Sequence, residues 1–463
     1  MVGINRHTTV VLLCVLIVSI PAGAARSAEP SLTAVPQSAL IDQAVTIEVE
    51  HCRPNQVVVL RAVCFDDGGQ RWESRATFEA NSEGKVDPGR MVPKYGTYQS
   101  AAPMGLFWSM LNDGGPGRLR WFTSNSLEPI EIVVQLELDG EVVDQQRLVR
   151  QRILPTVTRR EIRESGLVGT LFLPGAEGPV GAIMVLGGSA GGLDEDTAAL
   201  LASHGYATLA LAYFNMESLP QDLAEIPLEY FEAAIDFLGR QDAVDAHRIA
   251  VQGISRGGEL ALLLGSTFPQ IRAVVAYAPS GIVWGSCCSP ETENKPAWTY
   301  KGKPITPLVS DEDDPAMQDL MAEERAKLSV GEPVAFTPGF RLSVEKATNL
   351  DAATIPVERT QGPIMLISGK ADDLWPSTEL AEIAVRRLRQ HSFPFRFAHL
   401  SYQDAGHYIS YPFQPTTVTE VMDLRDSAIV RFGGTPAGNV NASVDSWNHV
   451  LDFYRETLDR RRE

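Results

Sequence analysis

The sequence predicts two consecutive domains, an antiparallel β-sandwich and then a doubly wound α/β domain with a mainly parallel sheet. A chain of 463 residues is too long for one compact core. Before Pro155 the sequence shows short segments of alternating polarity and no helical periodicity of useful length, as in a sandwich. After Pro155, apolar β-rich runs alternate with amphipathic helical stretches, a pattern typical of strands that helices cover on both faces.

The first domain is expected over residues 31–155. Alternating runs at residues 44–49 and 57–63 predict two of its strands. Asp-Gly turn signals at residues 67–69 and 139–140 separate successive runs. Short strands joined by tight turns form antiparallel sheets, so this part of the chain is predicted to be the sandwich.

The second domain is expected over residues 156–463. Its predicted strands are an opening antiparallel hairpin near residues 160 and 167–173, followed by runs at 182–186, 207–212, 249–252, 273–278, 364–368 and 395–400. The stretch 281–359, rich in Pro and Gly, interrupts the alternation of strands and helices. We expect this insertion to form a lid over the functional site.

Residues 1–24 are predicted to be a secretory signal peptide. Arg6 precedes an apolar run at residues 10–20, and Ala22 and Ala24 supply the small residues of a cleavage site. The apolar run is too short for a comfortable membrane span, so no stable span is expected after cleavage. The sequence therefore predicts an exported protein, periplasmic or secreted, that begins near Ala25.

The charge balance argues against nucleic acid as a partner. The formal net charge is −18, and a chain so acidic repels phosphate backbones. The sequence contains no run of Lys and Arg longer than three residues and no zinc-type spacing of Cys and His. Neither nucleic acid nor a metal ion is therefore implied as a ligand.

Export would leave four cysteines in the mature chain, Cys52, Cys64, Cys287 and Cys288. An oxidising compartment permits disulfides, but the spacing does not set their pairing. For Cys52 and Cys64 in the first domain, a disulfide and two buried free thiols remain alternatives. We expect no bridge between Cys287 and Cys288, because a disulfide between adjacent residues is strained.

Two segments, residues 187–191 and 253–257, fit the pattern Gly-x-Ser-x-Gly, and both follow a predicted strand. Strand order chooses between them. In the α/β-hydrolase fold the nucleophile follows the fifth strand, and a loop that binds the oxyanion follows the third. Counting the opening hairpin as two strands, the run at 249–252 is the fifth. Ser255 is therefore the predicted nucleophile, and the loop containing Ser189 is the predicted oxyanion loop.

The oxyanion donors are expected to be backbone N–H groups. Arg256 begins the helix after Ser255, and Gly188 or Ser189 supplies the second N–H from the earlier loop. A dinucleotide site at this loop is the alternative. It fails because Ser189 breaks the Gly-x-Gly-x-x-Gly spacing and because the next strand ends at Tyr213 with no acidic residue.

The serine needs a base and an orienting carboxylate, in the chain order Ser, Asp, His. His407 lies in a loop just after a predicted strand, whereas His391, His399 and His449 fall on helices or within a strand and suit packing or surface roles. Two adjacent acids, Asp372 and Asp373, follow the seventh predicted strand. Adjacent side chains point in different directions, so only one of the two can orient the histidine.

Several segments resemble the acyl-CoA thioesterases related to bile-acid-CoA:amino-acid N-acyltransferase. They are residues 103–108, 169–174, 210–215, 253–260 and 406–409, and the resemblance runs from about residue 35 to the C-terminus. It implies a β-sandwich followed by an α/β-hydrolase domain, and it implies that Asp372 is the acid. The acyltransferase branch carries cysteine as nucleophile, so Ser255 resembles the hydrolytic branch. The segment 284–296 departs from the family pattern.

The resulting hypothesis is a serine hydrolase that cleaves acyl thioesters through an acyl-serine, with no bound cofactor. An exported carboxylesterase or lactone hydrolase similar to dienelactone hydrolase is the main alternative, and a catalytically silent binding protein is a remote one. If coenzyme A is the leaving group, its phosphates need cations. Lys301, Lys303 and Arg341, in the predicted lid, are the candidates.

Overall fold

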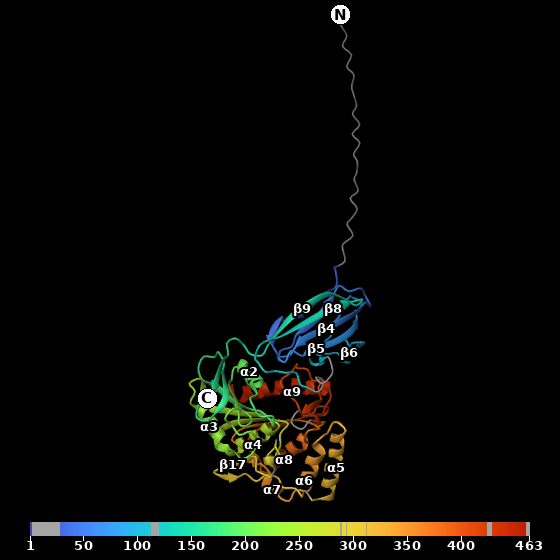
Figure 1. The fold of residues 1–463 in the computed structure, drawn as a ribbon. Coiled ribbons are helices and arrows are strands. Elements are labelled where there is room, and N and C mark those ends of the chain that lie inside the picture. Colours follow the sequence, from blue (N-terminus) through green and yellow to red (C-terminus); the bar gives the residue numbers. More distant parts are fainter. Residues whose placement is uncertain are drawn as a thin grey trace.

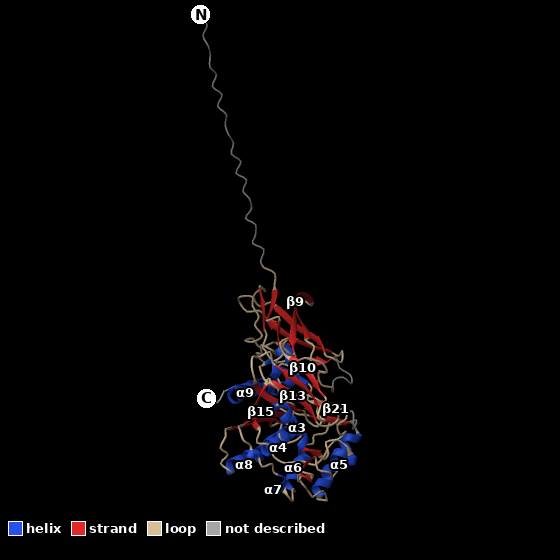
Figure 2. Ribbon diagram, turned by 90° about the vertical axis from the view of Figure 1, so that its left-hand side faces the viewer, coloured by secondary structure: helices blue, strands red, loops and turns tan. Residues whose placement is uncertain are grey.

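The structure is a computed structural model. The structure describes Met1 and residues 28–112, 120–287, 289–292, 294–311, 313–423 and 428–459. Apart from Met1, the predicted signal peptide lies outside these residues. Figure 1 shows a β-sheet part that precedes an α/β part along the chain, and Figure 2 shows that the helices gather in the α/β part.

The first part contains a seven-stranded sheet in the order β2-β9-β8-β4-β5-β6, with β7 paired to β5. Its strands are β2 (Ser38–Leu40), β4 (Val57–Phe65), β5 (Arg71–Glu79), β6 (Tyr95–Gly96), β7 (Leu111–Asn112), β8 (Ile130–Leu138) and β9 (Glu141–Gln151). Strands β1 (Ser31–Val35) and β3 (Thr46–Glu50) form a second, two-stranded sheet. Leu32 and Ile47 of that sheet lie in one buried cluster with Leu60 of β4, which forms the core between the two layers of the predicted sandwich.

Two details of the sandwich differ from the sequence prediction. The short strand β2 pairs in parallel with β9, whereas the rest of the large sheet is antiparallel. One short helix, α1 (Gly105–Trp108), is buried against the sheet. A helix of four residues leaves no periodicity in a sequence, so it could not be predicted.

The second part contains an eight-stranded sheet in the order β10-β11-β13-β12-β15-β16-β19-β20. The strands are β10 (Thr158–Ile162), β11 (Val168–Leu173), β12 (Val180–Leu186), β13 (Ala207–Ala212), β15 (Val244–Ile254), β16 (Ile271–Tyr277), β19 (Ile364–Gly369) and β20 (Phe397–Tyr402). Strands β10, β11 and β13 are antiparallel neighbours, and the other pairs are parallel. The predicted strand count is confirmed, with β12 third and β15 fifth. The expected domain boundary at residues 155 and 156 falls between β9 and β10.

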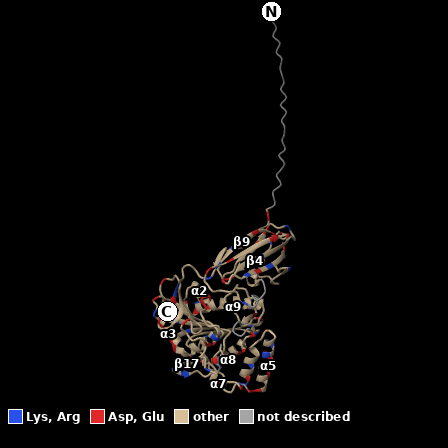
Figure 3. Ribbon diagram, viewed as in Figure 1, with Lys and Arg blue, Asp and Glu red and all other residues tan. Residues whose placement is uncertain are grey.

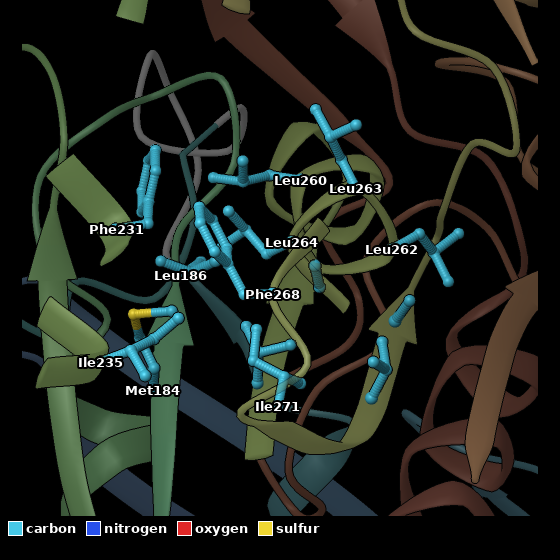
Figure 4. Close-up of a cluster of buried hydrophobic side chains, with 14 of the residues drawn as sticks. Met184, Leu186, Phe231, Ile235, Leu260, Leu262, Leu263, Leu264, Phe268 and Ile271 are labelled. Atoms are coloured by element: carbon cyan, nitrogen blue, oxygen red, sulfur yellow. The ribbon is translucent and has the colours of Figure 1, made fainter. Parts of the chain in front are cut away.

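Helices cover both faces of this sheet. One face carries α2 (Glu195–Ser203) and α9 (Pro436–Tyr454), and the other carries α3 (Leu228–Gly239), α4 (Arg256–Thr267) and α8 (Ser377–Gln390). Both faces need cover because side chains of a strand alternate between the faces and those of β12 are apolar on both. Ile183 lies in the cluster with the first helix layer, and Leu186 lies in the cluster with the second. Figure 4 shows Leu186 among Phe231 of α3 and Leu264 of α4.

The insertion 281–359 lies between β16 and β19. It contains β17 (Trp298–Tyr300), β18 (Lys303–Pro304), α5 (Pro315–Ser329), α6 (Thr337–Glu345) and α7 (Leu350–Ala353), which occupy the lower end of Figure 1. Its Ile282 and Trp284 pack in one cluster with Trp375 and Leu380, at the start of α8. The insertion is thus folded against the second part of the chain, and its role as a lid stays a prediction.

Cys52 and Cys64 are free and buried, so the first-domain alternative of two thiols is the one observed. Burial raises the pKa of the Cys64 thiol to about 12. Cys287 is disulfide-bonded. The expectation that Cys287 and Cys288 stay unbridged involves Cys288, which lies outside the described residues.

The described residues include no helix that is long and apolar enough to cross a membrane. Within the same ranges, His, Cys, Asp and Glu form no group of three that could hold a metal ion. Figure 3 shows Lys and Arg interspersed with Asp and Glu over both parts of the chain.

Candidate active site

Ser255 stands in a strained turn between β15 and α4. Its φ of 58° and ψ of −122° lie in a region that residues with a side chain rarely adopt. The Ser255 N–H donates to the carbonyl of Tyr277 at the end of the neighbouring strand, over 2.8 Å. The turn thereby presents the hydroxyl at the carboxyl edge of the sheet, where Ser255 is 8% exposed.

The glycines on either side of Ser255 are required by close backbone contacts. A Cβ added to Gly253 would lie 2.1 Å from the carbonyl oxygen of Gly257. A Cβ added to Gly257 would lie 2.3 Å from the carbonyl oxygen of Gly187, in the loop after β12. A larger residue at position 253 would clash within the turn, and one at position 257 would push the turn away from the loop after β12. The spacing of these glycines therefore has a steric cause.

The glycine-rich loop after β12 lies directly beside Ser255. A Cβ added to Gly188 would be 3.8 Å from the Ser255 Oγ. Tyr213 donates to the carbonyl of Gly187 over 2.7 Å and fixes the start of the loop. Ser189 follows in the same loop, and Arg256 opens α4, where first-turn N–H groups have no partner within the helix. The structure therefore places Gly188 and Arg256, two of the residues predicted to supply oxyanion donors, next to Ser255.

His407 and Asp372 form a buried pair. The Nδ1 of His407 lies 2.9 Å from the Oδ2 of Asp372, and the two residues are 3% and 4% exposed. The other carboxylate oxygen, Oδ1, accepts from the backbone N–H groups of Leu374 and Trp375 over 3.0 and 3.2 Å. Asp373 points elsewhere and pairs with Arg431 over 3.2 Å. Of the two adjacent acids, Asp372 is the one that meets the histidine.

The loop that carries His407 is held on several sides. The backbone N–H of His407 donates to the carbonyl of Phe432 over 2.8 Å. The rings of Trp375 and Phe432 flank the imidazole, with centroids 6.0 and 5.8 Å from its own. The indole N–H of Trp375 also donates to the carbonyl of Ala278, directly after β16, over 3.0 Å. Ser255, Asp372 and His407 follow β15, β19 and β20, whose carboxyl ends share one edge of the sheet.

A second histidine forms a superficially similar arrangement. The Nε2 of His399 lies 2.8 Å from the Oγ of Ser368, and its Nδ1 lies 2.8 Å from the Oε1 of Glu382. Ser368, the residue before the last of β19, is fully buried, so a substrate cannot reach it. His391 ends α8, and His449 contacts the carbonyl of Asp445 within α9.

Lys301 and Lys303 are exposed on the hairpin of β17 and β18. This hairpin lies along α4, since the ring of Tyr300 contacts that of Phe268, the C-cap of α4, at a centroid distance of 5.9 Å. Ser255 is the N-cap of the same helix, which has 12 residues and is about 18 Å long. The hairpin thus runs to the end of α4 that is remote from the nucleophile.

Arg341, on α6, is engaged by Glu379 of α8. Its Nε and Nη2 lie between 2.7 and 3.0 Å from the two carboxylate oxygens. The structure therefore places Lys301 and Lys303 at the far end of α4 from Ser255, and it pairs Arg341 with a carboxylate.

A cavity of about 580 Å³ borders the site between the two parts of the chain. Gly188 and Ile254 form part of its wall, next to Ser255, and Tyr408 follows His407. The first part of the chain contributes Trp121 and Phe122, and Trp121 contacts the ring of Tyr408 with centroids 4.9 Å apart. Sequence reasoning missed these two aromatic residues, because no motif marks a loop that reaches across to another domain.

Both parts of the chain are similar to proteins of known families. The family described as "Acyl-CoA thioester hydrolase/BAAT N-terminal region" matches residues 42–164, and "BAAT / Acyl-CoA thioester hydrolase C terminal" matches residues 226–460. The peroxisomal succinyl-coenzyme A thioesterase of Mus musculus is 31% identical over 90% of this chain and 94% of its own. The bile acid-CoA:amino acid N-acyltransferase of Mus musculus is 32% identical over 92% of this chain and 97% of its own. The chain belongs to the family of acyl-CoA thioester hydrolases and bile acid-CoA:amino acid N-acyltransferases.

Proposed function

We propose that this protein is a serine hydrolase that cleaves acyl thioesters of the acyl-CoA type through an acyl-serine intermediate. The observation that carries the proposal is the buried contact of 2.9 Å between His407 and Asp372, at the sheet edge where the strained turn presents Ser255. Family membership supports the thioester as the bond that is cleaved. Serine at position 255 supports hydrolysis, because water attacks an acyl-serine readily once a base activates it.

Each residue has a defined part in the proposed reaction. The Oγ of Ser255 attacks the thioester carbonyl while the Nε2 of His407 takes its proton, and Asp372 holds the imidazole in the required tautomer. The N–H of Arg256, with that of Gly188 or Ser189, stabilises the oxyanion. The protonated His407 then gives its proton to the departing thiolate. Water, activated by the same histidine, releases the acid and restores Ser255.

An exported carboxylesterase is the second candidate. The placement of Lys301 and Lys303 beyond the far end of α4 favours it, as does the engagement of Arg341 by Glu379, because coenzyme A needs cations for its phosphates. The chemistry at Ser255 is the same for oxygen and sulfur esters, so only contacts with the leaving group separate the two functions.

We expect hydrolysis of an acyl-CoA with a kcat/KM at least about tenfold above that of a neutral ester with the same acyl chain, a difference of about 1.4 kcal/mol in binding the transition state. Release of coenzyme A, followed with a thiol reagent, measures the first reaction, and acid release measures the second. Equal efficiencies for both substrates would favour the carboxylesterase. The variant carrying Lys301→Ala and Lys303→Ala tests the hairpin, since a rise in KM for acyl-CoA alone indicates phosphate binding there.

We also propose that the protein is exported. The proposal rests on the sequence of residues 1–24, with Arg6, the apolar run at 10–20 and the pair Ala22 and Ala24. Intact-mass analysis of protein isolated from its own host is expected to give a chain that begins near Ala25. Soluble protein that begins at Met1 would contradict export.

A further inference from the structure

A buried ion pair lies in the first turn of α4, directly after Ser255. The Nη1 of Arg256 is 3.1 Å from the Oε2 of Glu259, and their side chains are 8% and 0% exposed. Burial raises the pKa of the Glu259 carboxyl, while the Arg256 charge and the neighbouring N–H groups act in the opposite direction. Removing two charges from water is costly, and a surface pair at this helical spacing would stabilise the helix only slightly. The burial of this pair therefore calls for partners beyond the helix.

Those partners come from the insertion 281–359. The Oε1 of Glu259 accepts from the indole N–H of Trp298 over 2.9 Å and from the backbone N–H of Trp284 over 3.3 Å. The Nη2 of Arg256 donates to the carbonyl of Gly285 over 2.9 Å. The guanidinium also lies over the ring of Trp298, 6.0 Å from its centroid. The ion pair thus fastens two separate stretches of the insertion to the turn that follows the nucleophile.

The insertion also holds the loop that carries the acid. The hydroxyl of Thr337 donates to the carbonyl of Asp372 over 2.8 Å, and the Thr337 N–H donates to the carbonyl of Asp373 over 3.1 Å. The ring of Phe340 lies between Trp284 and Trp375, with centroids 4.8 and 5.8 Å away. Trp375 in turn flanks His407. Contacts therefore run without a break from Glu259 through the insertion to the histidine–aspartate pair.

We propose that Glu259 is a positioning residue for the reaction at Ser255. Through Arg256 and the insertion, it fixes the first turn of α4 relative to the loop of Asp372 and His407. Its effect on chemistry arises at the backbone N–H of Arg256, which must point at the oxyanion and not at the ground-state carbonyl. The inference rests on the proposed function in one respect, the role of that N–H as an oxyanion donor.

Glu259→Gln is the test variant, because it keeps the shape of the side chain and removes its charge. Glu358→Gln is the matched control, since Glu358 also forms an ion pair with an arginine, contacting Arg387 over 2.5 and 2.8 Å away from Ser255. Complete loss of an oxyanion donor costs about 10²–10³ in kcat, so a displaced donor is expected to lower kcat about 10- to 100-fold. We expect Glu259→Gln to show that loss with KM changed less than about threefold, while Glu358→Gln stays within about twofold of the wild type.

Two ligands separate positioning from a general structural effect. An acyl trifluoromethyl ketone forms a tetrahedral adduct with the serine, and a thioether analogue of acyl-CoA mimics only the ground state. Glu259→Gln is expected to raise the Kd of the ketone by the same factor by which it lowers kcat/KM. The Kd of the thioether is expected to stay unchanged. Equal weakening of both ligands, or a folded Glu259→Gln with the kcat of the control, would overturn the proposal.

A second variant covers the case in which Glu259→Gln does not fold. Replacing a buried ion pair by apolar residues is often neutral for stability, so Arg256→Met with Glu259→Leu is expected to fold and to show the same loss of kcat. Wild-type kcat in that folded double variant would also overturn the inference. If the wild type does not cleave acyl-CoA, the thioesterase proposal fails. The positioning role of Glu259 is then tested by fluorophosphonate labelling of Ser255. We expect Glu259→Gln to be labelled more slowly than Glu358→Gln.

Discussion

Replacing Ser255 with alanine is expected to lower kcat by about 10⁶-fold, because the serine, histidine and aspartate of such a site act as one unit. The residual rate would come from the oxyanion donors and from binding alone. The fold should survive, since only one small hydroxyl at the sheet edge is lost. Steady-state kinetics with an acyl-CoA measures the effect, and thermal unfolding checks that the variant is folded.

The matched control is Ser189→Ala, in the other Gly-x-Ser-x-Gly segment. We assign to Ser189 a backbone role beside Gly188, so removing its hydroxyl should lower kcat by at most about tenfold, or about 1.4 kcal/mol. A dead Ser189→Ala variant together with an active Ser255→Ala variant would reverse the assignment of the two segments.

Asp372→Asn is expected to lower kcat by about 10⁴-fold. An amide at this position would donate a hydrogen bond to the Nδ1 of His407, where the carboxylate now accepts one. The imidazole hydrogen would then sit on Nε2, facing the serine, and the histidine could no longer take the serine proton. Comparing kcat between the variant and the wild type at one fixed pH measures this effect.

Asp373→Asn provides the control for this change. Asp373 pairs with Arg431 near the surface, where the two side chains are 31% and 49% exposed. Such pairs contribute little to stability, so its loss should change kcat by no more than a few-fold. Equal, mild losses in Asp372→Asn and Asp373→Asn would show that another carboxylate orients His407.

The fold was predictable where each strand carries its own signal. Residues 182–186 and 207–212 are apolar apart from Thr208, because helices cover both faces of the sheet. Such runs allow parallel strands to be recognised in the sequence. The strand count that follows distinguishes Ser255 from Ser189. The parallel pairing of β2 with β9 was not predictable, because those strands are more than a hundred residues apart and a three-residue strand has too little pattern.

The site was predictable to the extent that it is built from local motifs. Ser255 and His407 lie in turns whose glycines mark them, and family resemblance separated Asp372 from Asp373. The charge of Lys301 and Arg341 suggested phosphate contacts, but charge alone does not say which end of a helix a hairpin reaches or that Glu379 engages the arginine. Glu259 and Thr337 escaped notice because their contacts join segments distant in the chain.

The unusual backbone angles of Ser255 also bear on how this protein would change if hydrolysis ceased to matter. A conformation of this kind costs a residue with a side chain about 1–3 kcal/mol, and glycine avoids most of that cost. Retaining serine at position 255 is therefore a stability loss that only the use of its hydroxyl offsets. In a duplicated copy released from selection for activity, random substitution would drift toward glycine at this position. The residue at 255 in such copies would then record whether their site is still in use.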